Sequence, residues 1–282
     1  MAQSQLIPPP SNAEAARLNE QHKQLIEAFG FHVHPTISLP HKEGCRVADV
    51  ACGSGVFLTE IAAEHPSWQC DGFDITDKQF PSGESLAHFG GRVRFHVQDG
   101  AAELGYGSEY DGKFDLVTVR AMHAFVIGVH WPRVVKNAVA LLKPGGYVQI
   151  EWDAQSPRVV QSKPGVSGTA MRLLNQGFND FILTRGVKDI IPLRDLLSQN
   201  GITDLRSELW AMDETPGYRQ NFTMTMIVDA PNAIMARVLQ GDKYWSREKV
   251  EQLKAQAAEE MKQDGIWFRT EMWCYVGKKS ED

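Results

Sequence analysis

A short stretch from Val47 to Gly55 constrains the fold of this chain more than any other part of its sequence. The letters VADVACGSG read as a buried strand that ends in a glycine-rich turn, and the apolar residues that follow indicate a helix. At such a turn, free N–H groups and the helix dipole converge, and α/β sheets bind nucleotides there. The stretch therefore predicts an α/β fold with a ligand site at the turn, where glycines let a ligand touch the backbone.

The charge of the expected ligand follows from Asp49, which lies near the end of that strand and four residues before Gly53. A carboxylate there would repel phosphate, so we expect a ligand that carries positive charge. S-Adenosylmethionine, with its ammonium and sulfonium groups, is such a ligand. The G-x-G-x-x-G fingerprint of dinucleotide-binding domains is incomplete, because Leu58 stands where its third glycine would fall.

The rest of the chain repeats a β-α alternation that is typical of a doubly wound α/β sheet. Seven strands are expected, at about 46–51, 69–75, 93–97, 114–119, 147–152, 204–212 and 266–275. Helices are expected at about 12–29, 55–65, 131–142, 169–185, 188–200 and 246–264. Segment 154–168 is predicted to be a loop, and 213–240 shows no clear periodicity. In domain terms, we expect an N-terminal tail and helical lid at 1–43 and one domain at 44–282, with cap insertions at about 154–200 and 213–264.

Polar residues at the ends of these strands are candidate ligand contacts. Asp74 lies 19 residues after Gly55, and an acid at about this distance takes the ribose hydroxyls in nucleoside-binding α/β domains. Ile75 could lie against an adenine face. Asp99 could accept a hydrogen bond from an adenine amino group, although a simple helix cap is an open alternative. Arg120, at the end of the fourth strand, would face the cofactor and the transferred group.

Five ordered segments together resemble class I adenosylmethionine-dependent methyltransferases. They are Val47–Gly55, Phe73–Ile75, Val97–Ala101, Phe114–Val119 and Leu141–Tyr147. The chain also resembles, more closely, fungal secondary-metabolite methyltransferases, including those related to velvet-complex regulators. The residues that carry this similarity are Leu18–His22, His34-Pro35, Gly72–Ile75 with Gln79–Pro81, Arg120, and Leu142–Gln149 with Glu151. One departure is Ala51, where the family usually has glycine.

The resemblance implies a Rossmann-like methyltransferase sheet with helical N-terminal and C-terminal caps, and S-adenosylmethionine as the cofactor. Asp49, Gly53 and Gly55 would hold the methionine moiety, Asp74 the ribose and Asp99 the adenine edge. The full set of expected cofactor contacts is Asp49, Ala51, Cys52, Gly53, Gly55, Asp74, Ile75, Asp99, Gly100 and Arg120.

Catalysis by such a domain needs little more than alignment of the acceptor, because the sulfonium methyl is already activated. A hydroxyl or thiol acceptor is helped by a base with a pKa near neutrality, and histidine supplies one. His123 is the first candidate, although a place at a helix start is an open alternative. His22 is second, if the N-terminal helix folds over the cofactor, and Glu151 with Asp153 is third. We expect no metal.

The composition of the chain limits the kinds of partner that we expect it to bind. The net charge of −6 gives no electrostatic footprint for nucleic acid or an anionic membrane, and no apolar run is long enough for a membrane span. The four cysteines show no spacing that predicts zinc or a disulfide framework. Together with the resemblance, this predicts a cytoplasmic enzyme that methylates a small molecule, with oxygen favoured over nitrogen or sulfur and a homodimer left open.

Two other functions remain open at this point. The first is a protein of this fold that binds adenosylmethionine but catalyses a pericyclic or dehydration step, or only regulates, because a fold does not fix a function. The second is a nicotinamide-dependent oxidoreductase, which Leu58 at the third-glycine position disfavours.

Overall fold

A computed structural model of the chain describes residues 12–39, 44–122, 130–153, 159–184, 192–262 and 265–281. These residues fall into two compact units. Unit 1 lies within Met1–Asp153, Ile191–Leu209 and Trp273–Asp282, and unit 2 lies within Ala154–Ile190 and Trp210–Met272.

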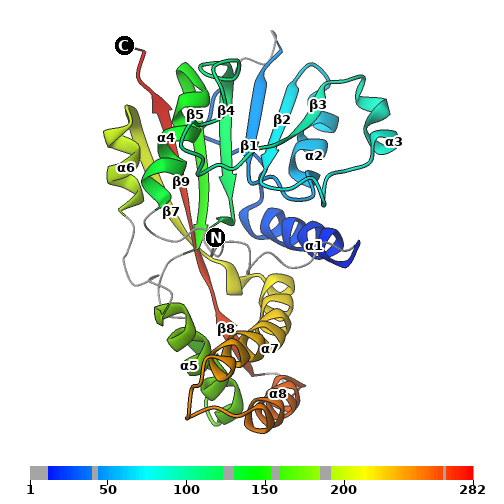
Figure 1. The fold of residues 1–282 in the computed structure, drawn as a ribbon, viewed down its shortest axis with the longest axis vertical. Helices are drawn as coiled ribbons and strands as arrows, with labels where there is room; N and C mark the ends of the chain where they lie inside the picture. The colour runs from blue at the N-terminus through cyan, green and yellow to red at the C-terminus, as the bar shows by residue number, and fades with distance from the viewer. Residues whose placement is uncertain are drawn as a thin grey trace. The chain divides into compact units, whose positions relative to one another are not determined.

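Unit 1 is built on a seven-stranded sheet with the order β3-β2-β1-β4-β5-β9-β7 (Figure 1). The strands are β1 (Arg46–Val50), β2 (Gln69–Asp74), β3 (Val93–Val97), β4 (Phe114–Arg120), β5 (Leu142–Asp153), β7 (Ile202–Ala211) and β9 (Glu271–Lys279). The pairs β1–β2, β1–β4, β2–β3 and β4–β5 are parallel, whereas β9 runs opposite to β4 (Figure 1). The prediction of a doubly wound α/β sheet with seven strands is confirmed.

Helices cover both faces of this sheet because its central strands are apolar on both sides. Successive side chains of a strand point to opposite faces. In β1, Val47 packs in a core with Phe57 and Ile61 of α2, whereas Ala48 packs in a second core with Val134 of α4. The helices of unit 1 are α1 (Asn12–Phe29), α2 (Val56–Glu64), α3 (Gly83–Leu86), a 3-10 helix η2 (Ala87–Phe89), α4 (Trp131–Leu141) and α6 (Leu193–Gln199).

Parallel pairing brings the carboxyl ends of β1, β2, β3 and β4 to one edge of the sheet. In the register, Asp49 of β1 lies beside Gly72 of β2 and Thr118 of β4. Helix α1 lies beside the same edge, below the strand ends in Figure 1. This edge is therefore where side chains from distant parts of the sequence meet.

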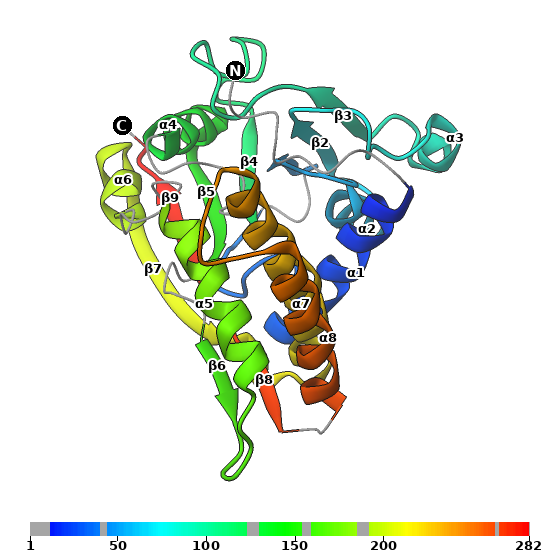
Figure 2. The same cartoon turned by 60° about the horizontal axis from the view of Figure 1, so that its bottom comes forward.

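Unit 2 is a helical unit with a small sheet. Helices α5 (Thr169–Thr184), α7 (Pro216–Leu239) and α8 (Arg247–Lys262) share one apolar core and lie together in Figure 2. Strands β6 (Val159–Ser162) and β8 (Ile266–Arg269) pair in an antiparallel ribbon, and a 3-10 helix η5 (Met212–Glu214) precedes α7. Across the described ranges, no helix combines the length and apolar character that a bilayer span requires.

Two of the sequence predictions for secondary structure are wrong, and a third segment, which showed no clear periodicity, is a helix. The strand expected at 266–275 is two strands in different sheets, β8 and β9, because an alternating pattern does not reveal where the pairing partner changes. The loop expected at 154–168 contains β6. Segment 213–240 forms α7, whose buried residues Met226, Ala230 and Ile234 are four apart, although Pro231 within the helix obscures the pattern.

Smaller features agree with the sequence. The four cysteines are buried and free, so none forms a disulfide. By contrast, residues 143–146, which lie between the helix expected at 131–142 and the strand expected at 147–152, fall within the bounds of β5, where the register between β4 and β5 shifts. The N-terminal helix is confirmed as α1, with the predicted bounds.

Candidate functional site

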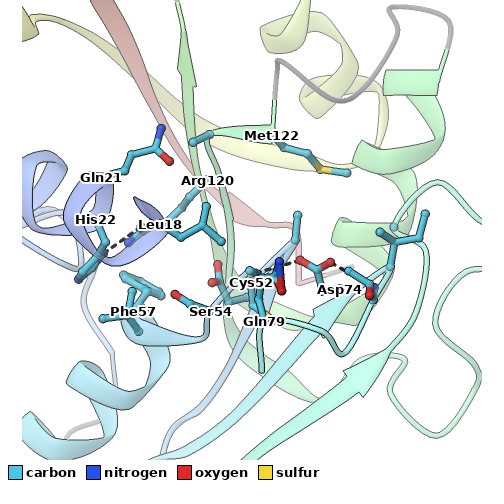
Figure 3. A pocket seen from close by; sticks show the side chains of 18 of the residues that line it. Leu18, Gln21, His22, Cys52, Ser54, Phe57, Asp74, Gln79, Arg120 and Met122 are labelled. Atoms are coloured by element: carbon cyan, nitrogen blue, oxygen red, sulfur yellow. Dashed lines mark hydrogen bonds between the residues drawn. The ribbon is translucent and has the colours of Figure 1, made fainter. Parts of the chain in front are cut away.

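A cavity of about 220 Å³ lies at the carboxyl ends of the first four strands, entirely within unit 1 (Figure 3). The turn after β1 and the first turn of α2 form one wall, and α1 contributes Leu18, His22 and Leu25. Ten of the predicted site residues line it: His22, Asp49, Ala51, Cys52, Gly53, Asp74, Ile75, Asp99, Gly100 and Arg120. Gly55 and Glu151 are not among the lining residues, and His123 lies outside the described residues.

Three residues of the turn after β1 have a left-handed backbone. The φ angles of Ala51, Gly53 and Gly55 are +57°, +54° and +72°. A Cβ atom at Gly55 would collide with the ring of Phe95, and one at Gly53 would lie 3.0 Å from a methyl group of Leu18. Gly55 is therefore favoured by space as well as by conformation, and Gly53 chiefly by its left-handed conformation, whereas Ala51 bears a strained φ.

Asp74 closes the turn from the end of β2. Its Oδ2 accepts a hydrogen bond from the backbone N–H of Gly53 at 2.9 Å (Figure 3). Burial raises the pKa of Asp74 even though backbone N–H groups hydrogen-bond to it. Nearby, the Oε1 atom of Gln79 is buried without a hydrogen-bond partner among the described residues. Both side chains offer acceptor oxygens to a ligand with hydroxyl groups.

Asp49 forms the floor of the cavity and is only 3% exposed. Its Oδ1 accepts a hydrogen bond from the Thr118 hydroxyl at 2.6 Å. Burial raises the pKa of Asp49 to about 6, and the nearby Arg120 charge and the Thr118 hydrogen bond only partly oppose this effect. A positively charged ligand group beside Asp49 would restore its ionised form.

Asp99 follows β3 and completes a row of three carboxylates. Its Oδ1 accepts a hydrogen bond from the backbone N–H of Ala101 at 2.8 Å, so it also caps the turn that follows. In the strand order β3-β2-β1-β4, the strand ends present Asp99, Asp74 and Asp49, and then the cation Arg120.

Arg120 joins the cavity to α1 and α2. Its Nη2 donates a hydrogen bond to Nδ1 of His22 at 3.0 Å, and its guanidinium carbon lies 4.1 Å from the ring centroid of Phe57 (Figure 3). Next to it, Glu151 is 1% exposed; its Oε1 accepts a hydrogen bond from Gln149 at 2.9 Å, and its Oε2 lies 3.7 Å from Nε of Arg120. Burial raises the pKa of Glu151, against the effect of Arg120.

Sequence reasoning missed two residues next to His22, namely Phe57 and Glu60 of α2. Oε2 of Glu60 accepts from Nε2 of His22 at 2.9 Å and from Nε2 of His32 at 2.8 Å. It also missed the hydrogen bond from the Ser54 hydroxyl to Asn19 of α1, 2.6 Å long. No local pattern marks these contacts, because each joins residues that are far apart in the sequence.

His22, His32 and Glu60 also form a group that could hold a metal ion, since their ligand atoms lie within 4.8 Å of one another. The hydrogen bonds favour a different use. Because Arg120 donates to Nδ1 of His22, the ring proton is on Nε2 and points to Glu60. That nitrogen then has no lone pair for a metal.

Comparison with protein families agrees with the strand-end arrangement: residues 47–146 match a family described as a methyltransferase domain. The chain carries a methyltransferase domain. The match confirms the class predicted from the five sequence segments, and with it S-adenosylmethionine as the cofactor of such a domain. The methyltransferase domain covers the glycine turn, Asp49, Asp74, Asp99 and Arg120.

Two proteins similar to this chain are fungal. Over 197 residues it is 26% identical to methyltransferase grgD of a Penicillium species, covering 65% of this chain and 63% of grgD. Over 137 residues it is 28% identical to protein-methionine methyltransferase laeA of Emericella nidulans, covering 48% and 33%. The chain therefore spans less than two thirds of the length of these relatives.

Among solved structures, the chain is similar to phosphoethanolamine N-methyltransferase 2 of Haemonchus contortus in complex with phosphomonomethylethanolamine and S-adenosylhomocysteine. The TM-score is 0.48 at 17% sequence identity. The similarity covers 93% of this chain and 52% of that chain.

Proposed function

We propose that this protein transfers the methyl group of S-adenosylmethionine to a hydroxyl oxygen of a small molecule of secondary metabolism. The observation that carries the proposal is the row of carboxylates at the strand ends, above a glycine turn, in one cavity of a methyltransferase domain. Adenosylmethionine presents an adenine amino group, ribose hydroxyls and a cationic amino acid in the same order.

The residues of the cavity fit this cofactor group by group. The carboxylate of Asp99 and the acceptor atoms of Asp74 and Gln79 suit the donors of adenine and ribose. Asp49, almost fully buried, suits a cationic group, which offsets the cost of its own burial. The Cβ position of Gly53 faces Leu18, so a glycine there lets α1 approach the turn closely.

The chain's part in the reaction is then mostly alignment. When bound, S-adenosylmethionine supplies a methyl group that the sulfonium already activates. Leu18 and Leu25 of α1 line the cavity and exclude water from it, which favours transfer to the acceptor over side reactions. The acceptor must lie in line with the bond that breaks, so positioning contributes much of the rate.

A base for the acceptor hydroxyl remains part of the proposal. His123, which follows Met122 in the sequence, lies outside the described residues and stays a prediction. His22 uses both ring nitrogens in hydrogen bonds to Arg120 and Glu60. Glu151 lies next to Arg120 but is not itself among the lining residues. We therefore propose His123 as the base.

The cofactor part of the proposal is tested by the substitution Asp74→Ala. Loss of its hydrogen bonds to a bound ribose should weaken S-adenosylhomocysteine binding by about 1–3 kcal/mol in isothermal titration calorimetry. The exposed Asp77, three residues on, provides a matched control, and Asp77→Ala should bind as the unaltered protein does. Equal affinities for the two variants would remove Asp74 from the site.

The reaction itself is tested with adenosylmethionine and a panel of small molecules that carry hydroxyl, amine or thiol groups. We expect formation of adenosylhomocysteine together with a hydroxyl-containing product heavier by one methylene unit, detected by mass spectrometry. Methylation confined to amines or thiols would refute the choice of oxygen. Cofactor binding without turnover of any compound would favour a non-methylating role.

A further inference from the structure

Helix α1 is the wall of the cavity that the expected cofactor contacts leave largely unused. Those contacts come from the turn after β1 and from the ends of the first four strands. The residues of α1 that line the cavity are Glu14, Leu18, Gln21, His22 and Leu25. All of them except His22 recur at intervals of three or four residues, so they lie on one face of the helix. This face is therefore available to the second substrate, the methyl acceptor.

Among the described residues of this wall, Gln21 is the polar side chain whose hydrogen-bonding groups are unused. Glu14 accepts hydrogen bonds from Nε and Nη2 of Arg17, at 2.8 and 2.7 Å. His22 uses both of its ring nitrogens, as described above. Gln21 is only partly buried and makes no hydrogen bond with the part of the chain that the structure describes. Its amide is therefore open to a ligand.

The surroundings of the Gln21 amide are apolar. Leu18 lies three residues before it and Leu25 four residues after it, and all three line the cavity. Figure 3 shows Gln21 at the α1 side of the cavity, away from Asp74 and Gln79. An amide offers one kind of donor and one acceptor, and a hydroxyl group can use either of them. The wall thus suits a molecule with an apolar body and a hydroxyl group.

The charges near this wall are already balanced. Glu14 is paired with Arg17, and Nε of Arg120 lies 3.7 Å from a carboxylate oxygen of the buried Glu151. Burial, and after it the charge of Arg120, lowers the pKa of His22 to about 4, so that ring is neutral at ordinary pH. A charged acceptor group beside α1 would be desolvated without a counter-charge of its own, which is costly.

We propose that Gln21 binds an uncharged hydroxyl group of the acceptor, with Leu18 and Leu25 against its apolar body, and that this wall selects alcohols and phenols over carboxylic acids. This inference rests on the proposed function. Because an amide does not titrate, Gln21 orients the acceptor and determines specificity, and it does not act as the base.

The first test compares matched neutral and ionised acceptors on the unaltered protein with S-adenosylmethionine. The pairs are phenol with benzoic acid, cyclohexanol with cyclohexanecarboxylic acid, and any other methylated hydroxyl compound with its carboxylic acid analogue. In water at neutral pH the carboxylate is the better nucleophile of each pair, so intrinsic reactivity alone would favour the acids. We expect the hydroxyl compound to be methylated at least about 10-fold faster, measured by mass spectrometry.

The possible failures of this test are distinguishable. Equal or faster methylation of the acids would overturn the inference and leave methyl transfer from adenosylmethionine standing. If the protein binds adenosylhomocysteine but methylates none of the compounds, the proposed function itself is refuted.

The second test asks whether Gln21 makes the contact. Gln21→Met keeps the length of the side chain but removes the amide, so it should raise KM for phenol by about 3- to 10-fold. The affinity for adenosylhomocysteine, measured by calorimetry, should not change. Gln24→Met is the matched control, because Gln24 lies on the same helix, donates a hydrogen bond to Glu20 and does not line the cavity.

Three results of the second test would contradict the role of Gln21. They are an unchanged KM in Gln21→Met, an equal rise of KM in Gln24→Met, and a loss of adenosylhomocysteine affinity in Gln21→Met as large as the rise in KM. The last of these would assign Gln21 to the cofactor instead of the acceptor.

Discussion

Asp49 shows how a single buried carboxylate links pH to both binding and stability. Its pKa of about 6 in the folded protein is raised chiefly by burial. A cationic ligand binds the ionised form, so adenosylmethionine affinity should fall as pH decreases through about 6. Titration calorimetry between about pH 8 and about pH 5 measures this effect. Asp49→Asn should bind weakly throughout, and a pH-independent affinity of the unaltered protein would contradict the expectation.

The same group should affect the unliganded protein in the opposite direction. The pKa of Asp49 in the folded protein lies above the ordinary value of 3.8, so protonation of Asp49 stabilises the folded state. This stabilisation is complete below about pH 4 and is lost as pH rises through about 6. Above this range Asp49→Asn should therefore be the more stable protein, by up to about 3 kcal/mol in denaturant unfolding. If the unfolding free energies of the two proteins change with pH in the same way, ionised Asp49 does not destabilise the folded protein.

Ala51 is a second residue whose substitution should change stability, because its backbone conformation is strained. It lines the cavity with φ at +57°, a region that costs an L-residue about 1–2 kcal/mol. Replacement by glycine removes this strain but adds freedom to the unfolded chain. The net result for Ala51→Gly should be a gain of about 0.5–1 kcal/mol in unfolding free energy. Val50→Gly, in the extended β1, should instead destabilise the protein, and a loss of stability in both would refute the strain argument.

At the scale of secondary-structure elements, α1 decides how closed the cavity is. It contributes five lining residues, and it is tied to the turn after β1 by the hydrogen bond between Ser54 and Asn19 and to α2 by His22 and Glu60. Leu25 and Phe29 are buried, so α1 is anchored at its C-terminal half. The N-terminal half is the part that can respond to a ligand.

We therefore expect S-adenosylhomocysteine to slow amide hydrogen exchange in α1, most strongly around Leu18 and His22. Contact with the bound molecule should hold the helix against the turn after β1 and reduce local opening. Helix α8, in unit 2, is the internal control and should exchange at the same rate with and without the ligand. Unchanged exchange in α1 at saturating ligand would show that the helix is a fixed wall and not a lid.

At the scale of the whole molecule, the methyltransferase domain and its cavity are formed by unit 1. Unit 2 has its own apolar core, in which residues such as Phe268 and Met171 are fully buried. Both units are discontinuous in sequence, since each is assembled from segments on either side of the other. The division into units is therefore a property of the folded chain and leaves no clear boundary in the composition.

Much of unit 1 could be predicted because its information is local. A strand such as β1 and its turn are encoded within nine consecutive residues, and the acids of the cavity stand at the ends of recognisable strands. Helix α7 was harder, because Pro231 interrupts the apolar pattern that identifies a helix. The division of 266–275 between β8 and β9 depends on pairing partners, which no local pattern specifies.

The sequence by itself determined the α/β class, the glycine turn and the order of Asp49, Asp74 and Asp99, because these follow from periodicity and spacing between near neighbours. Only the tertiary structure decided how Arg120 is held. Its partner His22 lies 98 residues away in the sequence. Glu60, which accepts a hydrogen bond from that histidine, lies 38 residues from it. Such contacts depend on how the helices pack against the sheet, and packing is a property of the whole fold.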